Sequence, residues 1–163
     1  MENINLKLER STIDDKDVLK NLYLYYAHDL SEFNDSLKTD PNGLFGNSID
    51  LYFNDGRLIP LKIILENSII GFLFCSKGQT VDYVIQDMFI LRNYRNRGLG
   101  KLALKQLFSL YPGKFGLDIL IKNTPAKLFW THCLEHLGIN YTSSELISDG
   151  QLGTRLFFNS RKS

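Results

Sequence analysis

The stretch Arg95-Asn96-Arg97-Gly98-Leu99-Gly100 lies where an apolar segment gives way to one with helical periodicity. A helix that begins inside this stretch leaves several backbone N–H groups unpaired around one point. Gly98 and Gly100 have no side chains, so a diphosphate could approach these groups, and the positive end of the helix dipole would attract it. The stretch therefore predicts an anion-binding turn. Three basic side chains surround it: Arg95, Arg97 and Lys101.

The flanking segments alternate between strand and helix patterns. Thr12 and Asp15 resemble a capping box before one helix, and Thr124 and Pro125 resemble the N-cap and first residue of another. Residues 31–56 are polar, with a short helix expected only over 49–53. The expected strands cover residues 5–9, 58–66, 69–75, 81–91, 115–121, 139–147 and 152–158, and the expected helices begin after residues 12, 98 and 124. This order predicts a mixed α/β fold.

Composition narrows the class of protein. A chain of 163 residues fits one domain over 1–163, and a net charge of +1 gives no support for binding to nucleic acid. The two cysteines, Cys75 and Cys133, lie in apolar runs, which favours a reducing, cytoplasmic location. No apolar run is long enough to span a membrane, so we expect a soluble protein without a membrane partner.

The sequence around the turn resembles the GNAT (GCN5-related N-acetyltransferase) superfamily. Residues 95–100 resemble its pyrophosphate motif, Gln/Arg-x-x-Gly-x-Gly/Ala. Residues 85–95, Ile-Gln-Asp-Met-Phe-Ile-Leu-Arg-Asn-Tyr-Arg, resemble its strand-to-turn segment. Residues 123–130, Asn-Thr-Pro-Ala-Lys-Leu-Phe-Trp, resemble its Asn-x-x-Ala-x-x-Phe-Tyr/Trp signature. The resemblance is specific over residues 85–138.

This resemblance implies a GNAT-like fold, with a twisted mixed sheet of about six to seven strands and helices on both faces. It implies an N-acetyltransferase that uses acetyl-CoA as co-substrate, without a metal. Pantetheine would lie where the strand over 87–91 splays from the strand over 115–121, often at a bulge. Backbone groups of Phe89, Ile90 and Leu91 would hold the pantetheine arm. The diphosphate would lie at the turn, formed by Arg95, Asn96, Arg97, Gly98, Leu99, Gly100 and Lys101. The other side of the thiol arm would be lined by Asn123, Ala126, Phe129 and Trp130.

Acetyl transfer requires a neutral amine, and an alkylamine has a pKa of about 10, so a base must remove a proton. Asp87 matches the position where many family members carry a carboxylate, although a structural carboxylate fits the same position. Many relatives protonate the leaving thiolate with a tyrosine, whereas Trp130 stands here. Tyr141 or Cys133 could replace that acid, but core packing explains both residues better, since aromatic and cysteine side chains in apolar runs are usually core.

The acceptor side is expected to be acidic. Residues 29–55 contain six acidic side chains and one basic side chain, Lys38. This imbalance fits a cationic amine acceptor bound by Tyr26, Asp29 and Glu32, and it fits a solvated acidic loop equally well.

Two other functions stay open. A CoA-binding domain of the same fold that senses or recruits without catalysis would explain the missing tyrosine. His132-Cys133-Leu134-Glu135-His136 formally matches a zinc-peptidase pattern, but that function needs a third metal ligand. The sequence leaves a homodimer open and does not identify the acceptor.

Overall fold

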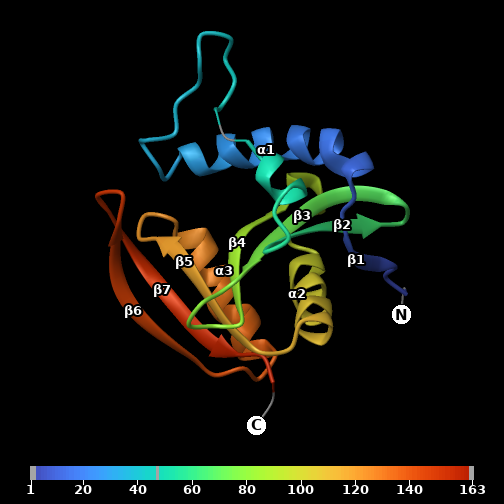
Figure 1. The fold of residues 1–163 in the computed structure, drawn as a ribbon. Helices are drawn as coiled ribbons and strands as arrows, with labels where there is room; N and C mark the ends of the chain where they lie inside the picture. The colour runs from blue at the N-terminus through green and yellow to red at the C-terminus, as the bar shows by residue number, and fades with distance from the viewer. Residues whose placement is uncertain (1–2, 47, 162–163) are drawn as a thin grey trace.

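The computed structural model describes residues 3–46 and 48–161. Within these residues, seven strands form one mixed sheet in the order β1-β2-β3-β4-β5-β7-β6, and the main helices are α1, α2 and α3 (Figure 1). The strands are β1 (Leu6–Arg10), β2 (Leu58–Leu65), β3 (Ser68–Lys77), β4 (Tyr83–Ile90), β5 (Lys114–Leu120), β6 (Tyr141–Ser148) and β7 (Gln151–Asn159). The helices are η1 (Ile13–Asp15), α1 (Lys16–Ser31), η2 (Asp50–Phe53), η3 (Arg92–Tyr94), α2 (Leu99–Leu110) and α3 (Thr124–His136).

Two tight turns set the antiparallel hairpins. Glu66 and Asn67 join β2 to β3 with φ angles of 48° and 71°, and Asp149 and Gly150 join β6 to β7 with φ angles of 50° and 75°. Turns with both central residues at positive φ match the right-handed twist of paired strands. The two hairpins predicted from the sequence are therefore confirmed.

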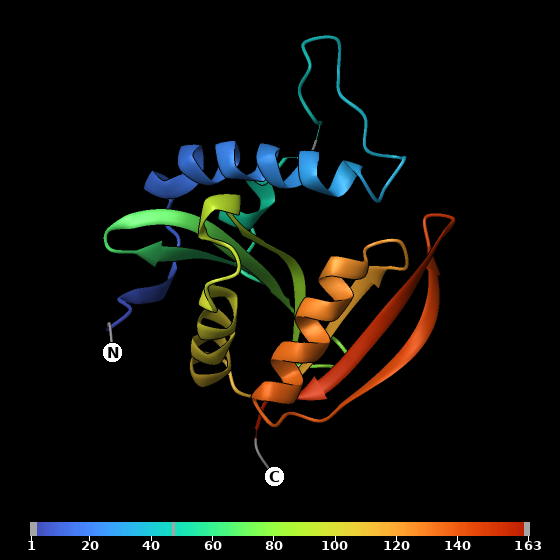
Figure 2. The ribbon, with the colours of Figure 1, turned by 180° about the vertical axis from the view of Figure 1, so that it is seen from behind.

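The sheet opens between β4 and β5. These parallel strands pair only from Tyr83 with Phe115 to Ile85 with Leu117. On the other side of β4, the register with β3 moves from Cys75 opposite Ile85 to Phe74 opposite Asp87, so Gln86 is the extra residue of a bulge. Figure 2 shows β5, β6 and β7 diverging from β1 to β4. The bulge therefore lies where β4 leaves its parallel neighbour.

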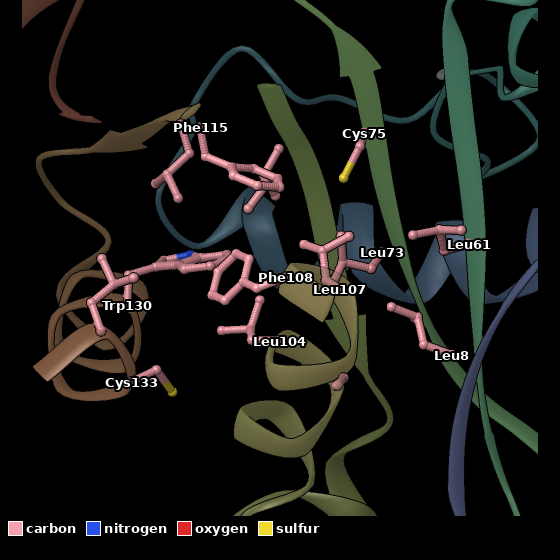
Figure 3. Close-up of a cluster of buried hydrophobic side chains, with 14 of the residues drawn as sticks. Leu8, Leu61, Leu73, Cys75, Leu104, Leu107, Phe108, Phe115, Trp130 and Cys133 are labelled. Atoms are coloured by element: carbon pink, nitrogen blue, oxygen red, sulfur yellow. The ribbon is translucent and has the colours of Figure 1, made fainter. Parts of the chain in front are cut away.

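The helices cover both faces of the sheet. One hydrophobic cluster, which includes Leu73 and Leu104, packs under α2 and α3 (Figure 3). The other, which includes Leu19, Phe72 and Phe74, packs under α1 and η2. Neighbouring residues of β3 face opposite ways, so one strand supports both clusters. The expected architecture, a mixed sheet with helices on both faces, is confirmed.

One predicted helix start is confirmed by the structure, and another is shifted. The Asp15 carboxylate accepts a hydrogen bond of 2.9 Å from the Thr12 backbone N–H, as the capping box predicted. At α3, however, the N-cap is Asn123 rather than Thr124: its side-chain oxygen accepts a hydrogen bond of 3.2 Å from the Ala126 N–H. A carboxamide at this position reaches the third helical N–H, so Thr124 becomes the first helical residue.

Among the described residues, no helix combines the length and the apolar character required to cross a bilayer.

Candidate active site

A cavity of about 530 Å³ lies beside the opening between β4 and β5. Four parts of the chain line it: the end of α1, the end of β4, the turn into α2, and one face of α3. The lining residues are Tyr26, Asp29, Leu30, Phe33, Met88, Phe89, Ile90, Tyr94, Arg95, Asn96, Gly98, Leu99, Gly100, Lys101, Asn123, Pro125, Ala126, Phe129, Trp130 and Cys133. A more polar hollow of about 440 Å³ surrounds the β3–β4 connection, at the other end of β4.

The turn into α2 has the geometry that an anion site requires. Gly98 is the N-cap of α2 and has a φ angle of 73°, which side-chain-bearing residues rarely adopt. The N–H groups of the first helical turn have no partner within the helix. Gly100 lies against α3, because an added Cβ would come within 2.7 Å of Cε2 of Phe129. Both glycines therefore keep side chains away from the start of α2.

Arg95 joins the turn to β4 and to α1. Its Nε donates a hydrogen bond of 2.7 Å to the Ile90 carbonyl, and its Nη2 donates one of 2.7 Å to Oδ2 of Asp29. Arg92 Nη2 donates a hydrogen bond of 2.6 Å to Oδ1 of the same carboxylate. Burial raises the pKa of Asp29, but the hydrogen bonds and charges of the two arginines outweigh burial, so the pKa is lowered. Asp29 is thus an ionised carboxylate with both oxygens engaged.

Asp87 lies behind two tyrosines of α1. Tyr26 Oη donates a hydrogen bond of 2.7 Å to Oδ1 of Asp87, and Tyr23 Oη lies 3.5 Å from Oδ2. Burial raises the pKa of Asp87 and outweighs the two tyrosine hydrogen bonds, which act in the opposite direction. Asp87 is not among the residues that line the cavity, whereas Tyr26 is.

The α3 side of the cavity is mainly apolar. Trp130 is 7% exposed and its indole points toward Phe108 in the core (Figure 3). Its ring meets Phe129 edge-on, with centroids 5.3 Å apart. Burial raises the pKa of the Cys133 thiol, which also lines the cavity, and the charge of Lys101 opposes that rise. An apolar wall of this kind suits a flexible, uncharged ligand arm.

Most residues expected at the coenzyme site line this one cavity, but five expected site residues do not. Asp87 accepts a hydrogen bond from the lining residue Tyr26, and the Leu91 N–H donates to the Ile70 carbonyl. The other three are the exposed Glu32, Arg97, whose guanidinium lies 5.7 Å from the Tyr94 ring centre, and Tyr141, whose Oη lies 3.4 Å from Oε1 of Glu135.

Cys133, considered from the sequence only as a substitute acid, also lines the cavity. Five further lining residues were not expected from the sequence: Leu30, Phe33, Met88, Tyr94 and Pro125. A signal was available for two of them. Leu30 and Phe33 follow Tyr26 by four and seven positions, which is the spacing of one helical face. Both residues could therefore have been predicted from Tyr26, which was expected to bind the acceptor.

The described residues place no three His, Cys, Asp or Glu side chains close enough to hold a metal ion. His132 and His136 lie on α3, and no third ligand group of these types completes a site with them in that part of the chain.

Comparison with known proteins identifies the fold and the family. The sequence profile of the acetyltransferase (GNAT) family matches residues 21–134. A search of curated protein sequences found no match.

Solved structures with the same fold include three acetyltransferases. An acetyltransferase from Thermus thermophilus is 18% identical, with a TM-score of 0.69, over 96% of this chain and 98% of that one. The diaminobutyrate acetyltransferase from Paenibacillus lautus, solved with L-2,4-diaminobutyric acid and coenzyme A, is 13% identical, with a TM-score of 0.68, over 99% of both chains. The spermidine N-acetyltransferase from Vibrio cholerae, solved with CoA and spermine, is 16% identical, with a TM-score of 0.65, over 95% of this chain and 96% of that one.

The family match covers more than half of the chain, including β4, the glycine turn, α2, β5 and most of α3. Together with the seven-stranded sheet of the described residues, it leads to one conclusion. The chain belongs to the GNAT family of acetyltransferases.

Proposed function

We propose that this protein transfers an acetyl group from acetyl-CoA directly to a primary amine of a small molecule or peptide. The observation that carries the proposal is the position of the cavity, which runs from the Gly98 turn to the opening between β4 and β5. Acetyl-CoA supplies an activated acyl carbon as a thioester. The protein supplies an anion site, an apolar channel and a carboxylate, all close to one cavity.

The residues of the turn would hold the diphosphate. The first N–H groups of α2 have no partner within the helix, and they lie in the turn that Gly98 and Gly100 keep free of side chains. Lys101 lines the same cavity and adds positive charge. The pantetheine arm would then lie along Phe89, Ile90, Asn123, Ala126 and Phe129. These residues position the coenzyme and exclude water, which accounts for a large part of the rate enhancement expected of such a site.

Asp87 would serve as the base that removes the proton of the amine. Its raised pKa makes it a stronger base than an ordinary aspartate. We assign no acid to the leaving thiolate, because Trp130 has no proton to give at neutral pH, Tyr141 lies outside the cavity, and core packing accounts for the buried Cys133. A thiol pKa of about 8.5 allows the thiolate to leave without such help.

The acceptor is proposed to carry a second positive charge. The solved relatives from Paenibacillus lautus and Vibrio cholerae contain a diamine acid and a polyamine, respectively. Here Asp29 lines the cavity, but its carboxylate is shared by Arg92 and Arg95. The selectivity for such an acceptor therefore depends on how much negative charge Asp29 retains toward the cavity.

Release of the coenzyme thiol tests the proposal. The purified protein is incubated with acetyl-CoA and, in turn, spermidine, L-2,4-diaminobutyrate and butylamine, and the acetylated product is identified by mass spectrometry. We expect acetylation of at least one amine, with spermidine and L-2,4-diaminobutyrate, which carry a further ammonium group, faster than butylamine. Binding of acetyl-CoA without acetylation of any amine would favour the CoA-binding sensor instead. If butylamine is acetylated faster than the other two amines, the proposal of an acceptor with a second positive charge is wrong, and the proposal of acetyl transfer stands.

The reducing, cytoplasmic location stays a prediction from the cysteines. In the structure, Cys75 and Cys133 are both buried and neither forms a disulfide.

A further inference from the structure

Tyr26 joins the cavity lining to the carboxylate of Asp87. The tyrosine lines the cavity, and its Oη donates a hydrogen bond of 2.7 Å to Oδ1 of Asp87. Asp87 itself is not part of the lining. Tyr26 therefore contacts both the cavity and the carboxylate.

The surroundings hold this hydroxyl in place. The Tyr26 ring packs edge-on against Phe72 and Phe89, with ring centres 5.5 and 6.0 Å apart, and against Tyr23 at 5.4 Å. Such aromatic contacts have preferred geometries, so they restrict the ring and thereby the direction of its hydroxyl. Because the hydroxyl proton points to Asp87, a lone pair of the Tyr26 oxygen is available to a second partner.

We propose that Tyr26 is a proton relay that connects the acceptor amine to Asp87. This role rests on the proposed function, because it requires an amine acceptor in the same cavity. It assigns Tyr26 a chemical step in addition to contact with the acceptor.

The step conserves protons and electrons. The ammonium group of the acceptor gives one proton to Tyr26 Oη while the Tyr26 proton passes to Oδ1 of Asp87. The nitrogen lone pair so freed forms the bond to the acetyl carbon, and the C–S bond breaks with its electron pair kept on sulfur. The remaining surplus N–H proton passes to the thiolate, directly or through water. Asp87 later returns its proton to water by the same path.

The ionisation of the neighbouring groups agrees with a relay. Burial, followed by the nearby charge of Asp87, raises the pKa of Tyr26 well above its usual value. The tyrosine therefore stays protonated in any ordinary buffer and can accept a proton only while giving one away. The titratable groups facing Asp87 are Tyr23 and Tyr26 from α1 and Tyr52 from η2, and burial raises the pKa of each.

Tyr23 offers a comparison on the same helix. Its hydroxyl also faces Asp87, but at 3.5 Å, and it is not part of the cavity lining. Its ring stacks on Phe72 and Phe74, with centres 5.6 and 6.2 Å apart. Tyr23 can therefore support Asp87 but cannot connect it to an amine in the cavity.

The test is the pH dependence of kcat for the fastest amine of the panel. The variants are Tyr26→Phe, Asp87→Asn and the double variant. We expect each single change to lower kcat about 100-fold at pH 7, with little change in KM, because proton transfer by a positioned group contributes this order of magnitude. The loss should shrink as the pH approaches about 10, where the amine is already neutral. The double variant should be no slower than either single variant, because both changes break one path.

Two controls separate the relay from packing. Tyr25→Phe changes the neighbouring exposed tyrosine and should keep kcat within about twofold, as expected for a surface change. Tyr23→Phe should lower kcat by only a few-fold and keep the wild-type pH profile.

The outcomes separate the relay from the proposed function. If Tyr26→Phe keeps the wild-type kcat, or loses kcat by the same factor at every pH, the relay is wrong. Acetyl transfer itself is not affected by that result. Absence of turnover with every amine would overturn the proposed function itself. Thermal melting of each variant shows whether it is folded. If Tyr26→Phe does not fold, Asp87→Asn alone must show the pH-dependent loss, and a pH-independent loss in that variant overturns the relay.

Discussion

Gly98 has a left-handed backbone conformation, with a φ angle of 73°, and an added Cβ would meet nothing within 4 Å. A side chain here would be strained by the backbone and would project into open space at the start of α2. Gly150 in the β6–β7 turn has nearly the same conformation, φ 75°, with the same free space. The two glycines thus differ in location, and a side chain at either position would be strained to a similar degree.

Substitutions at Gly98 and Gly150 distinguish an effect on coenzyme binding from an effect on stability. We expect Gly98→Val and Gly150→Val to lower the free energy of unfolding by a similar amount, about 1–2 kcal/mol each. Only Gly98→Val should weaken binding of acetyl-CoA, by at least about 100-fold, because the side chain would block approach to the N–H groups. Fluorescence of Trp130, the single tryptophan, measures binding, since Trp130 is among the residues that line the cavity. Equal affinities in the two variants would contradict the assignment of the turn.

The reactivity of the Cys133 thiol depends on whether a ligand occupies the same cavity. It lines the cavity and is 7% exposed, whereas Cys75 is 1% exposed in the core. Because burial raises the pKa of Cys133, a thiol reagent should react with it slowly at pH 7 and faster at alkaline pH. Coenzyme A should slow this labelling at least about tenfold, since it would cover the thiol. Peptide mapping by mass spectrometry identifies the labelled cysteine, and Cys133→Ser is the control. Labelling at an unchanged rate with coenzyme A present would place the ligand elsewhere.

At the scale of elements, Asp29 ties α1 to the segment that follows β4. Its carboxylate binds Arg92 and Arg95, which are 63 and 66 positions away in the sequence. The lowered pKa of Asp29 in the folded protein means that this contact stabilises the fold above the unfolded pKa of about 3.9. The stabilisation is lost as the pH falls through the lower, folded pKa.

Substitution of Asp29 should show this pH dependence. Asp29→Asn should lower the free energy of unfolding by about 1 kcal/mol at pH 7, after allowance for the exposure of the arginines. The difference from wild type should shrink as the pH falls below the unfolded pKa of about 3.9 and through the lower, folded pKa. Urea unfolding at several pH values measures it. The matched control is Asp35→Asn, because Asp35 is 92% exposed and lies 3.7 Å from Lys122, so we expect no measurable change. A loss at Asp29 that persists unchanged at acid pH would show that the ion pair is not its cause.

The elements themselves could be predicted because their signals are local. Two-residue turns, a change of hydrophobic period and the glycine turn are all contained within short windows of sequence. The Asp29 contacts could not be predicted, because no local pattern specifies which distant arginine a carboxylate will meet. The orientation of Asp87 was equally hidden. The bulge at Gln86 breaks the alternation of β4, so the face on which Asp87 lies does not follow from counting residues.

At the scale of the whole molecule, one sheet joins the two hydrophobic clusters. Ile49 belongs to the cluster under α1 and Ile63 to the cluster under α2 and α3, and both are buried. We expect Ile49→Val and Ile63→Val each to lower the free energy of unfolding by about 1 kcal/mol. The losses should add in the double variant, because the two sites do not share a cluster.

Denaturant unfolding followed by circular dichroism measures these losses and tests the prediction of one domain over residues 1–163. A single cooperative transition for all three variants agrees with one unit. Two transitions, each moved by only one of the substitutions, would show that the two faces unfold separately.

The cavity at the opening between β4 and β5 is where we expect acetyl-CoA to bind, and every other proposal depends on that binding. Calorimetric titration of the wild-type protein with acetyl-CoA tests it without knowledge of the acceptor. We predict one saturable site per chain, with a Kd in the range of about 1 μM to 1 mM that is typical of enzyme substrates. The site should be lost in Gly98→Val and kept in Gly150→Val. Absence of saturable binding to the folded wild-type protein would contradict the proposal that acetyl-CoA binds in this cavity.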